Sequence, residues 1–218
     1  MGLLRAGINF KLKSRTASGS IVFIHGLFMP SAIMLPLAGR MNRGGFHCYG
    51  YDYPTCRKRI PEHGRELAET LARFPVAKFH LVTHSMGGLI LRSALELAPE
   101  LTERLSRVVM IAPPNRGSDL ALKWLNRLSF AHKLVTPLPD LSSGKESPVH
   151  TLHIPSGVEI GILAAENDHA VNIEQTHLGV EQAHCILPGR HTNILFREDT
   201  AEAVEKFLRT GKFSSESS

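Results

Sequence analysis

The chain has 218 residues, a length that suits one domain with a substantial buried core. Hydrophobic residues make up 43% and charged residues 21%, which is typical of globular proteins and argues against a disordered chain. The net charge of +5 comes from basic residues scattered along the sequence, with Arg57-Lys58-Arg59 as the only tight cluster. We therefore expect no nucleic-acid partner.

The three cysteines, Cys48, Cys56 and Cys185, form no CxxC pair and have no zinc-ligand spacing. An odd number without a pattern is typical of reduced thiols. Polar residues interrupt every apolar run in the first twenty positions, and no stretch reaches the roughly 18 to 20 apolar residues that cross a bilayer. We expect a cytoplasmic protein without stable membrane insertion, and the sequence leaves the oligomeric state open.

Hydrophobic patterning predicts strands that alternate with helices along the chain. Pro30 and Pro61 open the first two helical patterns, and Gly44-Gly45 closes the first. Such alternation indicates right-handed βαβ units, and therefore an α/β fold with a mostly parallel sheet covered by helices on both faces. The expected strands are 20–25, 46–51, 78–83, 107–112, 158–164 and 181–187, and the expected helices are about 30–44, 61–74, 87–97 and 200–208.

The alternation lapses between about 120 and 155, in a Pro-, Ser- and Leu-rich stretch that contains Trp124, the only tryptophan. A long interruption of this kind in a compact α/β domain indicates a cap or lid. We expect the whole chain, 1–218, to be one domain. It would comprise an N-terminal segment over 1–19, the cap insertion, and a polar tail over 214–218.

Ser85 follows the third predicted strand, in the sequence Thr83-His84-Ser85-Met86-Gly87-Gly88. Ligands of an α/β sheet bind at the carboxyl ends of its strands. A serine on a sharp strand-to-helix turn exposes its hydroxyl, and small neighbours let the two backbones approach. Gly87 and Gly88 provide this on the helix side, whereas Thr83 replaces the first glycine of G-x-S-x-G. Ser85 is the candidate nucleophile, with a plain serine N-cap as the structural alternative.

A nucleophilic serine needs a base, and the base needs an orienting carboxylate. In sheets with this turn the chain order is Ser, then Asp or Glu, then His. Asp168 is the preferred acid, because it follows the strand at 158–164 and precedes a buried-looking valine by three residues; Glu166 is the alternative. His191 is the preferred base, because it lies between the last strand and the last helix. Other nearby histidines are expected to be packed or solvated: His84, His169 and His184.

Acyl transfer also needs hydrogen-bond donors for the developing oxyanion. The backbone N–H that follows the nucleophile belongs to Met86. A second donor is expected from the loop after the first predicted strand, where Gly26 permits the turn and Leu27 presents its N–H. Phe28 is an alternative donor, and its ring is expected to line an acyl pocket.

Together these motifs resemble those of small bacterial lipase- or esterase-like α/β-hydrolases, over about 20–213. The resemblance also rests on three further segments: Asp52-Tyr53-Pro54, Pro113-Pro114-Asn115-Arg116-Gly117-Ser118 and Pro188-Gly189-Arg190-His191-Thr192. It implies hydrolysis of a carboxylic ester or lipid through an acyl-enzyme on Ser85, with His191 as base and Asp168 as acid. It also implies an oxyanion hole from Leu27 and Met86, with no metal and no cofactor.

Two alternatives remain open at the level of sequence. The apolar residues near Trp124, Leu125, Leu128 and Phe130 would be either a lid over a fatty-acyl site or the core of a cap helix, so lipase and short-chain esterase are both allowed. The second alternative is a non-catalytic α/β-hydrolase used for binding or scaffolding, because a fold by itself does not fix a function.

Overall fold

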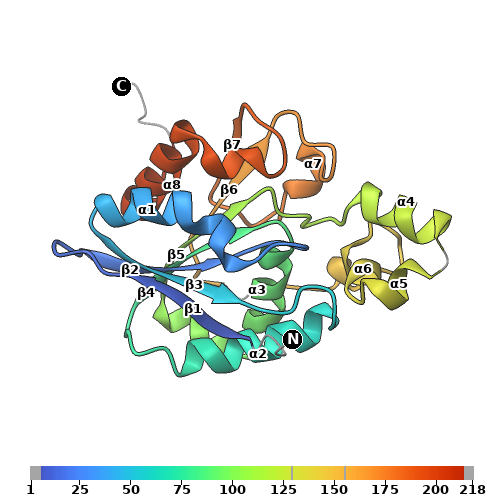
Figure 1. The fold of residues 1–218 in the computed structure, drawn as a ribbon, viewed down its shortest axis with the longest axis horizontal. Helices are drawn as coiled ribbons and strands as arrows, with labels where there is room; N and C mark the ends of the chain where they lie inside the picture. Colours follow the sequence, from blue (N-terminus) through green and yellow to red (C-terminus); the bar gives the residue numbers. More distant parts are fainter. Residues whose placement is uncertain (1–5, 129, 155, 214–218) are drawn as a thin grey trace.

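The computed structural model describes residues 6–128, 130–154 and 156–213. Within these ranges seven strands form one sheet in the order β1-β3-β2-β4-β5-β6-β7 (Figure 1). β1 is antiparallel to β3, and every other pairing is parallel. The predicted, mostly parallel α/β sheet is thereby confirmed. The strands are Gly7–Leu12 (β1), Gly19–Ile24 (β2), Phe46–Asp52 (β3), Phe79–His84 (β4), Leu105–Ile111 (β5), Ile160–Ala165 (β6) and Ala183–Leu187 (β7).

Helices cover both faces of the sheet, and each face has its own hydrophobic core (Figure 1). Successive side chains of a strand point to opposite faces. In β2, Val22 and Ile24 join the core beneath α2 and α3, whereas Ile21 and Phe23 join the core beneath α1 and α8, and all four are fully buried. These helices span Leu35–Arg43 (α1), Ile60–Ala72 (α2), Met86–Leu97 (α3) and Glu198–Thr210 (α8).

The N-terminal segment contains β1, a strand that sequence patterning did not predict. β1 forms one edge of the sheet and pairs only with β3 among the described strands, and three of its six residues are exposed while the other three are partly buried. Polar residues such as Asn9 and Lys11 break its apolar run and conceal it in the sequence. The predicted polar tail, 214–218, lies outside the described residues. The assignment of 1–218 to one domain stays a prediction.

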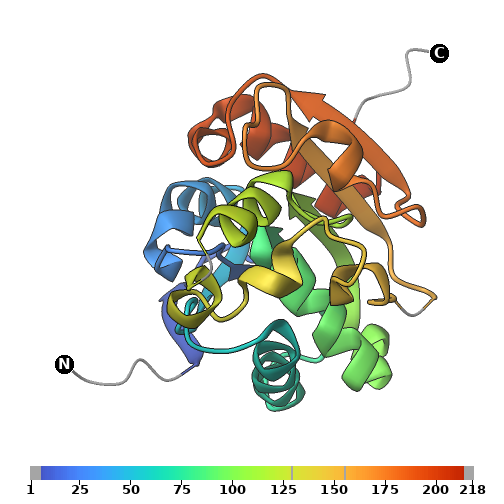
Figure 2. The ribbon, with the colours of Figure 1, turned by 90° about the vertical axis from the view of Figure 1, so that its right-hand side faces the viewer.

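Between β5 and β6 the chain forms three short helices at one end of the molecule (Figures 1 and 2). This is the stretch where the sequence alternation lapses, and it is helical rather than an extended linker. The helices are Asp119–Arg127 (α4), Ala131–Leu134 (α5) and Leu138–Leu141 (α6).

Shorter helical segments complete the chain: 3-10 turns at Ser31–Met34, Pro99–Arg104, Pro148–His150 and Asn193–Phe196, and Ile173–Thr176 (α7). Among the helices in the described ranges, none combines the length and the apolar character needed to span a bilayer.

Candidate active site

Ser85 occupies the turn between β4 and α3 in a conformation that non-glycine residues rarely adopt. Its φ is +51° and its ψ is −125°. The Ser85 N–H donates a hydrogen bond to the Ile111 carbonyl at 2.9 Å, which ties the turn to the end of β5. Strained backbone of this kind persists where the surrounding structure fixes it, often at functional sites.

The start of α3 lies directly against the end of β2, and this contact explains Gly87. A Cβ atom on Gly87 would lie 2.7 Å from the Ile24 carbonyl oxygen and 2.8 Å from that of His25, and neither backbone atom can yield easily. A Cβ atom on Gly88 would meet the Pro113 side chain at 3.2 Å, a milder contact. The close approach expected at both glycines is therefore strict at Gly87 only.

Ser85, His191 and Asp168 lie side by side at the carboxyl end of the sheet. His191 Nε2 is 2.8 Å from Ser85 Oγ, and His191 Nδ1 is 2.6 Å from Asp168 Oδ2. Because an ionised carboxylate can only accept, the Nδ1 atom carries the proton and Nε2 is free to accept the hydroxyl proton of Ser85. The structure thus brings together three residues that are up to 106 positions apart in the chain.

Asp168 is better placed than Glu166 to orient the imidazole. The Asp168 side chain is 1% exposed. Its Oδ1 atom accepts the backbone N–H groups of Ala170 at 2.7 Å and Val171 at 3.0 Å, and its Oδ2 atom faces His191. Glu166 is exposed, and its side chain accepts a hydrogen bond from the neighbouring Asn167 amide at 3.3 Å. The geometry therefore favours Asp168 as the acid.

In the loop after β2, the Phe28 N–H is engaged in a hydrogen bond, whereas the Leu27 N–H is not engaged with any described residue. Phe28 has a φ of +62°, and its N–H donates to the Thr55 hydroxyl at 3.2 Å. In the described part of the chain, the backbone N–H groups of Leu27 and Met86 have no hydrogen-bond acceptor. Two free donors thus flank Ser85, as an oxyanion hole requires.

His25 and Asp52 support this loop from below, and sequence reasoning gave neither of them a role. The His25 ring is fully buried, its Nε2 lies 2.8 Å from Asp52 Oδ1, and it stacks on Tyr53 at 4.3 Å. The Tyr53 hydroxyl donates to the His25 carbonyl at 2.6 Å. Burial lowers the pKa of His25, while Asp52 and Gly26 oppose that shift. The Asp52-Tyr53-Pro54 segment is the sequence signal that could have pointed to this pair.

His84 holds the loop that carries His191. Its Nε2 atom donates to the His191 carbonyl at 2.8 Å, because a carbonyl oxygen can only accept. Burial lowers the pKa of His84 to about 3, so the ring is neutral at pH 7. The hydrogen bond between His84 and the His191 backbone therefore needs no charge.

An apolar cavity of about 250 Å³ opens beside Ser85. Its walls come from the loop after β2, from the cap helices and from the segment after Asp168. The rings of Phe28 and Trp124, which both line it, lie 6.3 Å apart. Such a cavity fits an apolar group placed against the Ser85 hydroxyl. The other lining residues are Leu27, Met29, His84, Pro114, Ser118, Leu120, Ala121, Leu138, Leu141, Ala170, Val171 and His191.

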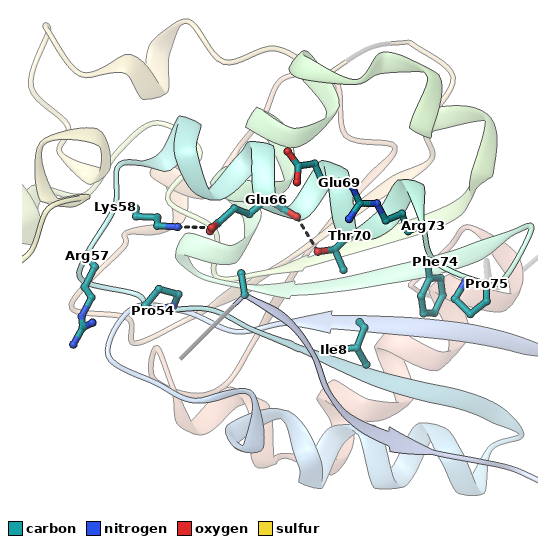
Figure 3. A pocket seen from close by; sticks show the side chains of 11 residues that line it. Ile8, Pro54, Arg57, Lys58, Glu66, Glu69, Thr70, Arg73, Phe74 and Pro75 are labelled. Carbon is teal, nitrogen blue, oxygen red and sulfur yellow. Dashed lines mark hydrogen bonds and ion pairs between the residues drawn. The ribbon is translucent and has the colours of Figure 1, made fainter. Parts of the chain in front are cut away.

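A larger cavity, of about 720 Å³, lies elsewhere, between β1 and α2 (Figure 3). Its lining mixes both signs of charge, and Figure 3 shows Lys58 paired with Glu66 and Arg73 beyond Glu69, opposite Ile8 of β1. Neither Ser85 nor His191 nor Asp168 borders this larger cavity. The cavity beside Ser85 is therefore the candidate active site. Among the described residues, no group of three or more His, Cys, Asp or Glu side chains is arranged to hold a metal ion.

Three solved structures illustrate what the fold is similar to. The mature form of a lipase from Bacillus licheniformis is 20% identical, with a TM-score of 0.69 over 95% of this chain and 97% of that one. A monoacylglycerol lipase from Paleococcus ferrophilus is 16% identical, with a TM-score of 0.71 over 96% and 100%. An esterase from Exiguobacterium antarcticum is 12% identical, with a TM-score of 0.70 over 92% and 94%. At these identities the likeness establishes the fold alone.

The comparison with curated proteins found no match. Residues 21–159, which are more than half of the chain, match the alpha/beta hydrolase family. The match covers the Ser85 turn, and the sheet order, the flanking helices and the solved structures agree with it. The chain therefore belongs to the alpha/beta hydrolase family.

Proposed function

We propose that this protein is a serine hydrolase that cleaves carboxylic esters through an acyl-enzyme on Ser85. The observation that carries the proposal is the hydrogen-bonded series from Ser85 through His191 to Asp168, which ends beside an apolar cavity. The lipases and the esterase with the same fold support the reaction class. We propose further that its substrate is a small ester or lipid. The three unpatterned cysteines of the protein, typical of reduced thiols, support a place in the cytoplasm.

In the first half of the reaction, Ser85 Oγ attacks the ester carbonyl carbon while His191 Nε2 takes the hydroxyl proton. The carbonyl oxygen becomes an oxyanion, which accepts hydrogen bonds from the Leu27 and Met86 N–H groups. Asp168 stabilises the imidazolium that forms. When the ester C–O bond breaks, His191 returns its proton to the alcohol oxygen, and the acyl group stays on Ser85.

In the second half, water replaces the alcohol. His191 takes a proton from the water as its oxygen attacks the acyl carbon, and the Ser85–acyl bond breaks with return of that proton to Ser85 Oγ. The products are a carboxylic acid and the free enzyme.

The cavity beside Ser85 favours an apolar acyl group. The chain length of the preferred acyl group decides between a lipase and a short-chain esterase. Rates on p-nitrophenyl esters of increasing chain length would measure this preference. A rise in rate above the solubility limit of a long-chain ester would favour a lipase, whereas a maximum at short chains would favour an esterase.

Replacement of the nucleophile tests the proposal directly. Ser85→Ala should abolish turnover of a p-nitrophenyl ester and labelling by a fluorophosphonate, with nearly unchanged Tm, because the hydroxyl supplies the bond-forming atom. Ser18→Ala, at an exposed serine, is the matched control and should retain both signals. Turnover by the Ser85→Ala protein would refute the assignment. A well-folded native protein that takes no label would favour the non-catalytic scaffold.

A further inference from the structure

Five large apolar side chains are exposed around the mouth of the cavity and on the cap helices. They are Phe28 (56% exposed), Trp124 (38%), Leu128 (46%), Phe130 (53%) and Leu134 (65%), and we name them the cap patch. The described residues include only six other exposed large hydrophobic side chains. An apolar cluster of this kind on a protein surface marks an interaction site.

The cap patch is not the core of the cap. Trp124 lies on α4, and Leu128 caps the carboxyl end of that helix, where its N–H donates to the Trp124 carbonyl at 2.9 Å. The residue that α4 buries is Ala121, and Leu125 packs partly against the main core. Trp124 and Leu128 therefore stay exposed at the carboxyl-terminal part of the helix, and the Trp124 ring lies beside that of Phe28.

Cations border this apolar surface. Residues 120–134 include Lys123, Arg127 and Lys133 and no aspartate or glutamate. All three cations are exposed, and within the described ranges none of them lies in an ion pair. Lys123 and Arg127 lie on α4, the helix that carries Trp124. The surface thus combines protruding apolar groups with unpaired positive charge.

We propose that the cap patch and its three cations dock onto a lipid surface with anionic headgroups. Apolar side chains can enter the boundary between headgroups and acyl chains, while Lys and Arg at the same depth attract the negative surface. α4 and α5 project from the end of the molecule, where a soft lipid surface can receive them without a complementary groove (Figures 1 and 2). Acidic residues, which a lipid surface of this kind would repel, are lacking over residues 120–134.

The base of the cap is fixed to the body, so the cap patch is presented in one orientation. Asp140, within α6, accepts Arg59 Nε at 2.8 Å and the Ile60 N–H at 2.9 Å. Ser118, at the start of α4, donates its hydroxyl to the Ala170 carbonyl at 2.6 Å. Docking would hold Phe28 and Trp124, at the mouth of the cavity, against the lipid. Delivery of a lipid ester to Ser85 rests on the proposed function, but the docking does not.

Trp124 makes the docking directly measurable, because it is the only tryptophan and lies within the cap patch. The experiment uses the full chain with Ser85→Ala, which removes turnover. Titration with vesicles of phosphatidylcholine and phosphatidylglycerol in equal parts should shift the fluorescence to the blue, and brominated acyl chains should quench it. Vesicles of phosphatidylcholine alone should bind at least tenfold more weakly. Because binding is read without catalysis, its outcome is independent of the proposed ester hydrolysis.

Charge reversal at the cap provides the specific test. Lys123→Glu with Arg127→Glu and Lys133→Glu should lower the partition onto anionic vesicles at least tenfold. The matched control is Lys13→Glu with Arg15→Glu and Lys78→Glu, which changes the same charges on exposed residues at the amino end of the sheet. An equal loss in both variants would reduce the effect to net charge and overturn the proposal. No fluorescence change with anionic vesicles would also overturn it, and would leave an acidic protein as the occupant to test.

Discussion

The two oxygens of the Asp168 carboxylate have different hydrogen-bond partners. Oδ1 is held by the Ala170 and Val171 N–H groups, and Oδ2 is aimed at His191 Nδ1. The orientation of the carboxylate is therefore set by its own turn and not by solvent. A change that keeps the size of the side chain but alters its hydrogen-bonding character should act on His191 alone.

Asp168→Asn makes that change. An amide NH₂ group directed at His191 Nδ1 would reverse the hydrogen bond and favour the tautomer that cannot take the Ser85 proton. We expect kcat for a p-nitrophenyl ester to fall by about 10³ to 10⁴, with Tm little changed. Glu166→Gln is the matched control, and it should retain activity because Glu166 is exposed and away from His191. A larger loss in Glu166→Gln than in Asp168→Asn would show that the acid is Glu166.

The sequence predicts some of these residues better than others. The difference depends on whether the contact that identifies a residue is close to it in the chain. His191 could be selected from its place between the last strand and the last helix. Asp168 and Glu166 both follow β6, so only the direction of each side chain separates them. The choice between Leu27 and Phe28 depended on Thr55, which is 27 positions away and binds the Phe28 N–H. No local sequence pattern predicts a contact between residues so far apart in the chain.

At the scale of elements, the junction of β2 with α3 sets the positions of both proposed oxyanion donors. Leu27 follows β2, Met86 begins α3, and Gly87 is the point at which the two backbones meet. Any side chain at Gly87 would separate the two elements. The distance between the Leu27 and Met86 N–H groups should therefore depend on this residue.

Gly87→Ala should lower both activity and stability. Its methyl group would press on the Ile24 and His25 carbonyls at less than 3 Å, and overpacking of this kind costs about 1 to 3 kcal/mol. Gly88→Ala is the control, because its methyl group would meet only side-chain atoms, those of Pro113, Thr83 and Met110, at 3.2 to 3.7 Å. Urea denaturation would measure the change in unfolding free energy. The change in kcat would measure the effect of displacing the Leu27 and Met86 N–H groups. Equal effects from the two substitutions would contradict this account of the junction.

The elements that sequence patterning missed are those without a full period or a buried face. β1 is an edge strand with one pairing partner, none of its residues is fully buried, and it lacks the apolar run that marks β2. α5 and α6 have four residues each, which is too short to show helical periodicity. The central strands and the long helices were predictable because their apolar residues face a core.

At the scale of the whole molecule, burial of histidines couples the fold to pH. Burial lowers the pKa of His63 and of His80 to about 4, and that of His84 to about 3. Their ordinary pKa is 6.5, so between about pH 6.5 and 4 the unfolded chain binds more protons than the folded one. The stability they contribute is present in full above pH 6.5 and is lost as the pH falls.

The free energy of unfolding, measured by urea at pH 7 and at pH 5, should therefore be lower at pH 5, by about 2 kcal/mol for each of the three histidines. His63→Gln isolates one of them, because His63 is fully buried and neither of its ring nitrogens forms a hydrogen bond within the described residues. Glutamine cannot take up a proton, so the variant should lose less stability between pH 7 and pH 5 than the native chain does. The carboxylates are the same in the variant and the native chain, so their contribution cancels in this comparison. Equal unfolding free energies at the two pH values would mean that the buried rings bind protons as easily in the folded chain as in the unfolded one.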